Sequence, residues 1–132
     1  HFITPSEALT RFDPIGEYDV HNYISWADTE RDLTAWRGNA MQDNALDETY
    51  KLGRKIHEKW AAAMTSGTDQ EKADASHLLN DWRKLTTSDH FYYMCTKYFA
   101  DGDVHKYFNP YDSPYDSYIN FMNVIDQLRT RI

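Results

Sequence analysis

The chain has 132 residues, enough for one domain with a modest hydrophobic core. Its formal net charge of -7 and its scattered Lys and Arg residues exclude a typical nucleic-acid-binding module, which would present a basic face. No apolar run approaches the roughly 20 residues that span a bilayer, so no membrane partner is expected. The single cysteine, Cys95, excludes an intrachain disulfide and fits a reducing compartment, so the expected location is cytoplasmic.

The first 24 residues are expected to be irregular. Pro5 and Pro14 interrupt regular structure, and Ile15-Gly16-Glu17-Tyr18 has the composition of a turn. A short helix is predicted next, with Ser25 as its N-cap and Gly38-Asn39 at its end.

Two long helices are predicted in the middle of the chain. The first runs from about Met41 to Met64, where apolar residues recur at helical spacing. Thr68 and Glu71 form a capping box that begins the second, which continues to about Leu85. An apolar stripe on each helix indicates that the two pack against other helices.

The last third of the chain predicts one short and one long helix. Ser88 is the expected N-cap of a short helix that continues to about Tyr98, and residues 100–112 are expected to form a loop. Ser113 and Pro114 then begin the last long helix as N-cap and first helical residue. With no strand-like alternation in the sequence, the predicted class is all-α. It comprises three long helices and one or two short ones, packed as a bundle in a single domain over 1–132.

The segment from Thr87 to Tyr118 is crowded with tyrosine and phenylalanine, and these alternate with Asp, His, Asn and Lys. A buried core needs apolar bulk but not so many phenol hydroxyls. Tyrosine joins an apolar ring to a polar tip, which suits a wall that meets a ligand or a neighbouring domain. Aromatic rings beside carboxylates and amides are typical of sugar-binding clefts.

Carboxylates near residue 30 are the first candidate site. On a helix, Asp28 and Asp32 would share a face, and Arg31 would pair with Asp28. Trp26 and Trp36 flank these acids and could line a sugar subsite. The alternative is a solvated helix start, where acids favour the positive end of the dipole. Both interpretations remain open.

Ser88-Asp89-His90 is the second candidate, because these residues would project from a helix N-terminus into a shared cleft. The alternative is again an acid placed favourably at a helix start. Asp101-Gly102-Asp103 with His105 lacks the ligand spacing of a calcium loop, so a turn role is favoured there. Cys95 is interpreted as a small core residue rather than a nucleophile. No metal, cofactor or catalytic residue is therefore expected within this chain.

Three stretches in the same order carry a family resemblance. They are ISWADTERDLTAWRGNAMQ at 24–42, TSDHFYYM at 87–94 and DGDVHKYFNPYDSPYDSY at 101–118. Together they resemble the C-terminal helical region of glycoside hydrolase family 57, in its α-amylase branch. The resemblance extends over nearly the whole chain, from Thr4-Pro5-Ser6-Glu7 to the last helix.

This resemblance implies a longer parent enzyme that acts on α-glucans by a retaining mechanism. In the family, an incomplete TIM-type barrel of seven strands carries a glutamate nucleophile and an aspartate acid/base. The chain has no match to the barrel motifs, and 132 residues cannot hold such a barrel together with a bundle. We therefore expect either an excised helical domain or a domain that has lost its barrel. In both cases it should be inactive alone, with 1–24 as a lead-in from a missing N-terminal barrel.

The resemblance also implies where substrate would bind. A conserved stretch of the family that completes the cleft matches Ser88, Asp89 and His90, while 25–28 and 30–32 are expected to face the barrel or the cleft. The predicted substrate-binding residues are Ser88, Asp89, His90, Trp26, Asp28 and Trp36.

Three partners are expected from the same resemblance. They are an α-glucan or maltooligosaccharide, the catalytic barrel, and a second copy through the face with Trp26, Trp36 and part of the 91–111 aromatics. Two alternatives stay open. One is a stand-alone bundle that binds carbohydrate or protein, and the other is a purely structural domain.

Overall fold

The computed structural model describes residues 2–97 and 107–132, and every regular element in these ranges is a helix. The elements are α1 (Pro5–Arg11), α2 (Thr34–Arg37), α3 (Ala40–Ser66), α4 (Asp69–Leu85), α5 (Ser88–Tyr92) and α7 (Pro114–Thr130). The all-α class is confirmed, with α3, α4 and α7 as the predicted long helices. The predicted short helices correspond to α2 and α5, and α1 is an additional one.

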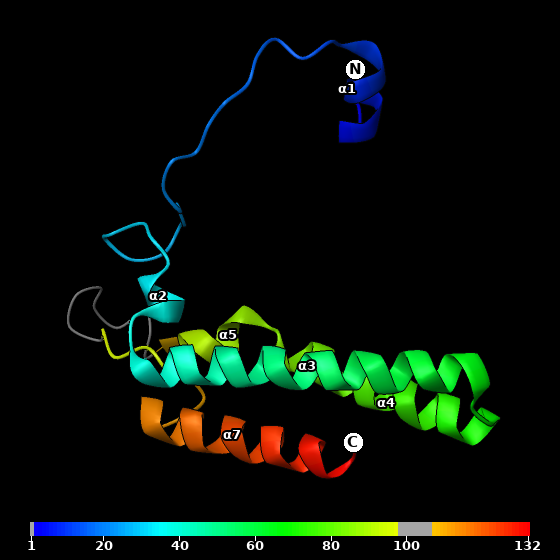
Figure 1. Cartoon of the computed structure of the whole chain (residues 1–132). Helices are drawn as coiled ribbons and strands as arrows, with labels where there is room; N and C mark the ends of the chain where they lie inside the picture. The colour runs from blue at the N-terminus through cyan, green and yellow to red at the C-terminus, as the bar shows by residue number, and fades with distance from the viewer. Residues whose placement is uncertain (1, 98–106) are drawn as a thin grey trace.

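Helix α3 is the axis of the bundle. Helices α4 and α7 both pack along it, and Figure 1 shows the three running lengthwise beside one another. Asn39 begins α3: its side chain accepts the Gln42 N–H, and Gln42 accepts the Asn39 N–H in return. Gly38-Asn39 therefore both ends α2 and begins α3.

The predicted caps of the other long helices are confirmed. Thr68 and Glu71 form the capping box of α4, and Ser113 caps α7 with Pro114 at its first position. Each cap satisfies backbone N–H groups that a helix start leaves unpaired. The local sequence thus sets the starts of α4 and α7 independently of tertiary packing.

The core lies where α3, α4, α5 and α7 face one another. Its fully buried members include Ile56, Met94 and Ile125. The remaining buried residues of this cluster are Ala45, Leu52, Leu78, Leu79, Leu85, Phe91, Phe121 and Leu128. Burying such side chains stabilises the fold by about 1.5–3 kcal/mol for each large aliphatic or aromatic group.

A glycine sets the close approach of α3 and α4. The indole of Trp82 on α4 lies over Gly53, where an added Cβ would be 2.4 Å from the ring. The same indole donates a hydrogen bond from Nε1 to the Thr49 carbonyl oxygen at 2.8 Å. Any side chain at Gly53 would therefore displace both the ring and its hydrogen bond.

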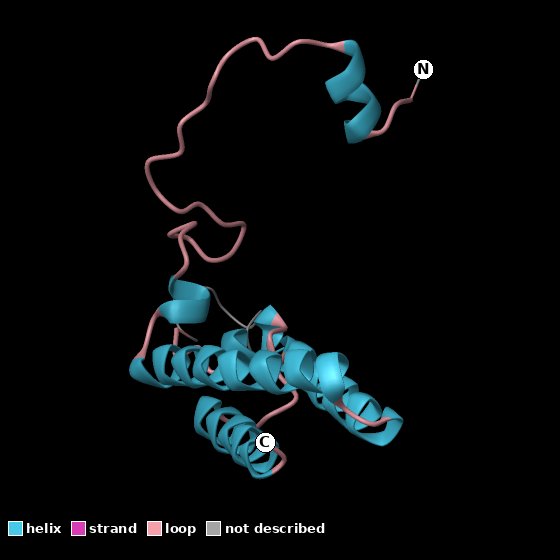
Figure 2. Cartoon of the chain, turned by 45° about the vertical axis from the view of Figure 1, so that its right-hand side comes forward, coloured by secondary structure: helices cyan, strands magenta, loops and turns pink. Residues whose placement is uncertain are grey.

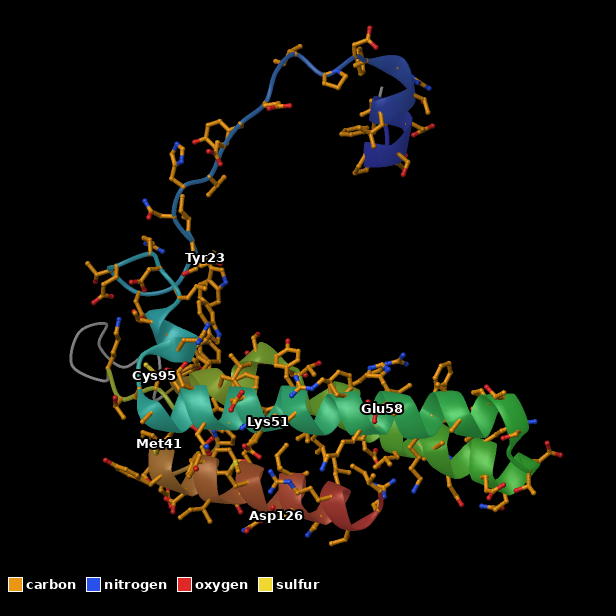
Figure 3. The ribbon with its side chains drawn as sticks, viewed as in Figure 1. Tyr23, Met41, Lys51, Glu58, Cys95 and Asp126 are labelled. Atoms are coloured by element: carbon orange, nitrogen blue, oxygen red, sulfur yellow. The ribbon has the colours of Figure 1, made fainter. Side chains whose placement is uncertain are left out.

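Residues 2–24, here called the arm, lie away from the bundle. Figures 1 and 2 show α1 at the far end of an extended segment that joins α2, and in Figure 3 the side chains up to Tyr23 project without a neighbouring helix. Its large apolar side chains are exposed: Phe2, Ile3, Leu9, Phe12, Ile15, Tyr18, Val20, Tyr23 and Ile24.

The expectation that the arm is irregular throughout is wrong for α1. Thr4 and Glu7 form a capping box, and Pro5 occupies the first helical position, where its missing N–H costs nothing. Pro5 therefore begins a helix rather than breaking one. Within 2–97 and 107–132, no helix is both long enough and apolar enough to cross a membrane.

Candidate functional site

Residues 25–33 form a loop, so the predicted helix over this stretch is wrong. Ser25 accepts the Ala27 N–H on its hydroxyl at 3.2 Å, and its own N–H donates to the Arg31 carbonyl at 2.8 Å. Asp28 and Arg31 have positive φ angles of 60° and 55°, which are incompatible with a continuous helix. Serine and aspartate that bond nearby backbone groups compete with helix formation, and here they prevail.

The acids of this loop do not share a helix face. The Asp32 carboxylate accepts the N–H of Thr34 at 2.8 Å and its hydroxyl at 2.6 Å, which holds the first turn of α2. These two hydrogen bonds lower the pKa of Asp32. Arg31 donates to the Trp26 carbonyl rather than pairing with Asp28 as predicted. Asp32 therefore has a structural role in beginning α2.

Asp28 lies beneath the loop rather than on its surface. Its side chain is 2% exposed, and its carboxylate is 3.7 Å from Lys97 Nζ. Lys97 also lies 3.3 Å from the Glu30 carboxylate and donates to the Thr34 hydroxyl. Desolvation lowers the pKa of Lys97, but the Glu30 hydrogen bond and the surrounding acids outweigh it, so the pKa is raised. Lys97 thereby fastens the loop to the segment that follows α5.

Three aromatic rings contact one another beside this loop. The Trp26 indole is 71% exposed and meets Trp36 edge-on, with ring centroids 5.8 Å apart. Trp36 in turn lies 6.0 Å from Tyr92, whose ring is buried. Helix α2 packs on α5 through these rings. The arrangement leaves the Trp26 indole exposed, with the rings of Trp36 and Tyr92 packed behind it.

Helix α5 places the second group of predicted residues. Its N-cap is Thr87, so the prediction of Ser88 as N-cap is wrong by one residue. This cap makes no side-chain hydrogen bond. Ser88 and Asp89 are exposed.

His90 in α5 and Tyr93 directly after it are both partly buried. His90 is half-buried: its ring lies 5.6 Å from Phe121, and its Nε2 is 3.2 Å from the Lys84 carbonyl oxygen. Burial raises the pKa of Tyr93, with a further contribution from the charge of Asp89. His90 therefore packs back onto the bundle, whereas its two preceding neighbours face solvent.

One pocket brings together members of both groups. It has a volume of about 220 Å³ and lies where α2, α3 and α5 meet the end of α4. Its lining residues are Leu33, Trp36, Arg37, Leu46, Thr49, Tyr50, Thr86, Ser88 and Phe91. Of the predicted site residues it contains Trp36 and Ser88. Trp26, Asp28, Asp89 and His90 are not part of its lining.

Tyr50 lines the pocket but was not among the predicted site residues. Its position in the apolar stripe of α3 suggested a core role, yet the side chain is 54% exposed. A tyrosine at the edge of an apolar stripe was the available signal, because the phenol hydroxyl favours a position that meets water. Tyr50 is a further candidate ligand contact.

A larger hollow between α3 and α7 has a different character. It has a volume of about 620 Å³ and is lined mainly by charged groups of both signs. Two of its cations are already paired, since Lys51 and Arg129 both contact Glu48. None of the predicted site residues lies in this hollow, and it has no aromatic ring in its lining.

Cys95 lies shortly before the end of the first described range, 2–97. Cys95 is 2% exposed, as expected for a core residue. Tyr98, most of the predicted loop at 100–112, and the Asp101-Gly102-Asp103 and His105 group lie outside the described residues.

Comparison with known proteins finds a relative in an archaeon. The chain is 35% identical over 125 residues to a protein of Methanocaldococcus jannaschii named "Putative alpha-amylase". No protein-family model matches the chain. No solved structure matches it either. The aligned region covers 93% of this chain but 26% of the relative, so the chain spans about a quarter of the length of the amylase-like protein to which it is related.

Proposed function

We propose that this chain is the C-terminal helical-bundle region of an α-amylase-like glycoside hydrolase. In this role it shapes α-glucan subsites and braces a catalytic barrel. The observation that carries the proposal is the 35% identity to the Methanocaldococcus jannaschii protein over nearly the whole of this chain. The resemblance to the α-amylase branch of glycoside hydrolase family 57 supplies the parent's retaining mechanism, and the single cysteine supplies the proposed cytoplasmic location.

The described surface supports a role in contact with a larger body. The arm exposes nine large apolar side chains, and Trp26 exposes most of its indole at the bundle edge where the arm begins. Exposed apolar surface of this extent is typical of an interface with a partner. For the isolated chain we expect self-association through the face with Trp26, Trp36 and part of the 91–111 aromatics.

A starch assay on the isolated chain tests the proposed division of labour. Retaining hydrolysis needs two carboxylates about 5 Å apart on either side of the bond, and we assign both to the barrel. We therefore expect no turnover of soluble starch. Clear turnover that Asp28→Asn or Asp89→Asn abolishes would show that the chain carries its own catalytic centre, contrary to the proposal.

A chimera tests the bracing role. In the Methanocaldococcus jannaschii protein, the matching quarter is deleted or replaced by this chain, and soluble starch hydrolysis is compared with that of the intact protein. Deletion is expected to abolish hydrolysis and replacement to restore part of it. Full activity after deletion would refute the proposal.

A stand-alone carbohydrate-binding bundle is the second candidate. The exposed Trp26 indole and the pocket with Trp36 favour it, because both are complete without a barrel. It predicts a measurable heat when the chain is titrated with maltoheptaose. The same titration without heat leaves the bracing role, which the chimera judges separately.

A further inference from the structure

The pocket with Trp36 and Tyr50, called the Trp36–Tyr50 pocket below, is lined mainly by apolar and aromatic side chains. Leu33, Leu46 and Phe91 contribute its apolar surface. Its volume of about 220 Å³ is below the range of about 300–1,000 Å³ typical of drug-sized ligands. A space of this size suits one small ring rather than an extended molecule.

Three polar groups stand at this pocket with hydrogen-bonding capacity to spare. Within the described residues, the hydroxyls of Ser88 and Tyr50 make no hydrogen bond to the protein. Arg37 uses its Nε for Asp43 at 3.0 Å, which leaves its two terminal amino groups for other acceptors. A few polar groups converging on an apolar surface are characteristic of a small-molecule site.

We propose that the Trp36–Tyr50 pocket binds a single pyranose ring of an α-glucan chain. The ring's C–H faces pack on the indole and the phenol, while its hydroxyls bond Ser88, the Tyr50 hydroxyl and the Arg37 guanidinium. This inference rests on the proposed function, since the α-glucan identity of the sugar comes from the amylase-like relationship. It adds Tyr50 and Arg37 to the substrate contacts and places them outside the loop that holds Asp28.

The polar groups favour a sugar over an apolar side chain from a partner protein. A leucine or phenylalanine side chain in the pocket would offer no hydrogen bond to the three polar groups, which would then depend on water. A pyranose ring has apolar faces and polar edges, so it can contact the apolar side chains and hydrogen-bond the polar groups of the lining together. Each hydrogen bond from Arg37 is charge-assisted and thereby stronger than a neutral one.

Titration of the full chain with maltotriose, followed by two-dimensional ¹H–¹⁵N NMR, tests the proposal. We expect saturable shifts of the Trp36 indole N–H and the Ser88 amide. Tyr50→Ala is expected to raise the dissociation constant about two- to tenfold, the range for loss of one aromatic contact. Tyr50 is more than half exposed, so this variant should retain the wild-type unfolding temperature.

Tyr115→Ala is the matched control, because Tyr115 is also an exposed helical tyrosine and lies outside the pocket lining. It should leave the dissociation constant unchanged. Equal affinities of wild type and Tyr50→Ala, or an absence of saturable shifts with maltotriose, would overturn the pocket assignment. Shifts produced by N-acetyl-leucine amide but not by maltotriose would overturn it too, in favour of a protein side chain. None of these results bears on the chimera, which decides the proposed function independently.

Discussion

Gln42 is the side chain that joins the elements of the candidate site. It is fully buried, and its amide uses all of its hydrogen-bonding capacity. The oxygen accepts the N–H groups of Gly38 at 2.8 Å and Asn39 at 3.1 Å. The nitrogen donates to the carbonyls of Ala35 at 2.7 Å and Phe91 at 2.9 Å. One residue of α3 thus fixes α2 and α5 relative to each other.

Replacing Gln42 by Leu keeps the approximate volume and removes all four hydrogen bonds. Gly38 is exposed and Asn39 is half-buried, so their N–H groups can turn to water. The Ala35 carbonyl belongs to a buried residue and cannot, whereas the Phe91 carbonyl keeps a hydrogen bond from the Met94 N–H at 3.1 Å. A buried group left unpaired costs about 1–3 kcal/mol, and the lost hydrogen bond to Phe91 adds about 0.5–1.5 kcal/mol. Burial of the leucine returns about 1–2 kcal/mol, so the expected net loss is about 1.5 kcal/mol.

Urea unfolding followed by circular dichroism measures this loss. Gln70→Leu is the control, because Gln70 bonds Asp74 on the exposed surface of α4 and its loss should cost at most about 0.5 kcal/mol. A loss for Gln42→Leu of about 0.5 kcal/mol or less, no larger than that of the control, would refute the reasoning. It would mean that α2 and α5 find equivalent hydrogen bonds without the amide.

Two further perturbations test the packing and the electrostatics of the bundle. Gly53→Ala should destabilise the protein by about 1–3 kcal/mol through overpacking against Trp82, whereas Gly16→Ala, with nothing within 4 Å, should have little effect; equal urea midpoints for the two variants would contradict this. The Arg131 hydrogen bond lowers the pKa of Asp81, so its stabilisation is present above the unfolded-state pKa of about 3.9 and is lost as pH falls through the folded value. Asp81→Asn should therefore lower stability at neutral pH by up to about 1 kcal/mol and reduce its decline below about pH 4; an unchanged acid profile would count against the ion pair.

The long helices could be predicted because their signals are local. Thr68 with Glu71, and Ser113 with Pro114, set helix starts through contacts only a few residues apart. The apolar stripes then select the buried face of each helix. Helix α1 was missed although its signal is equally local, because Pro5 was interpreted as a breaker rather than a first helical residue.

The candidate site could be predicted only in part, because distant segments build it. Lys97, far along the chain, provides the cation that holds Asp28 and Glu30 in a loop instead of a helix. Tyr50 faces a pocket because α2 and α5 close around it. No pattern within one helix contains this information.

The arm has a consequence for how the chain would meet a larger body. An extended segment advances about 3.3–3.6 Å per residue, so the stretch between α1 and Ser25 lets α1 reach surfaces tens of ångströms away. Once the bundle is seated, a short tether would keep α1 at an effective concentration in roughly the millimolar range near its landing site. A contact by Leu9 and Phe12 would then be occupied most of the time as long as its dissociation constant lies below this effective concentration. The occupancy of this contact would therefore depend on the length of the arm as much as on the affinity of its residues.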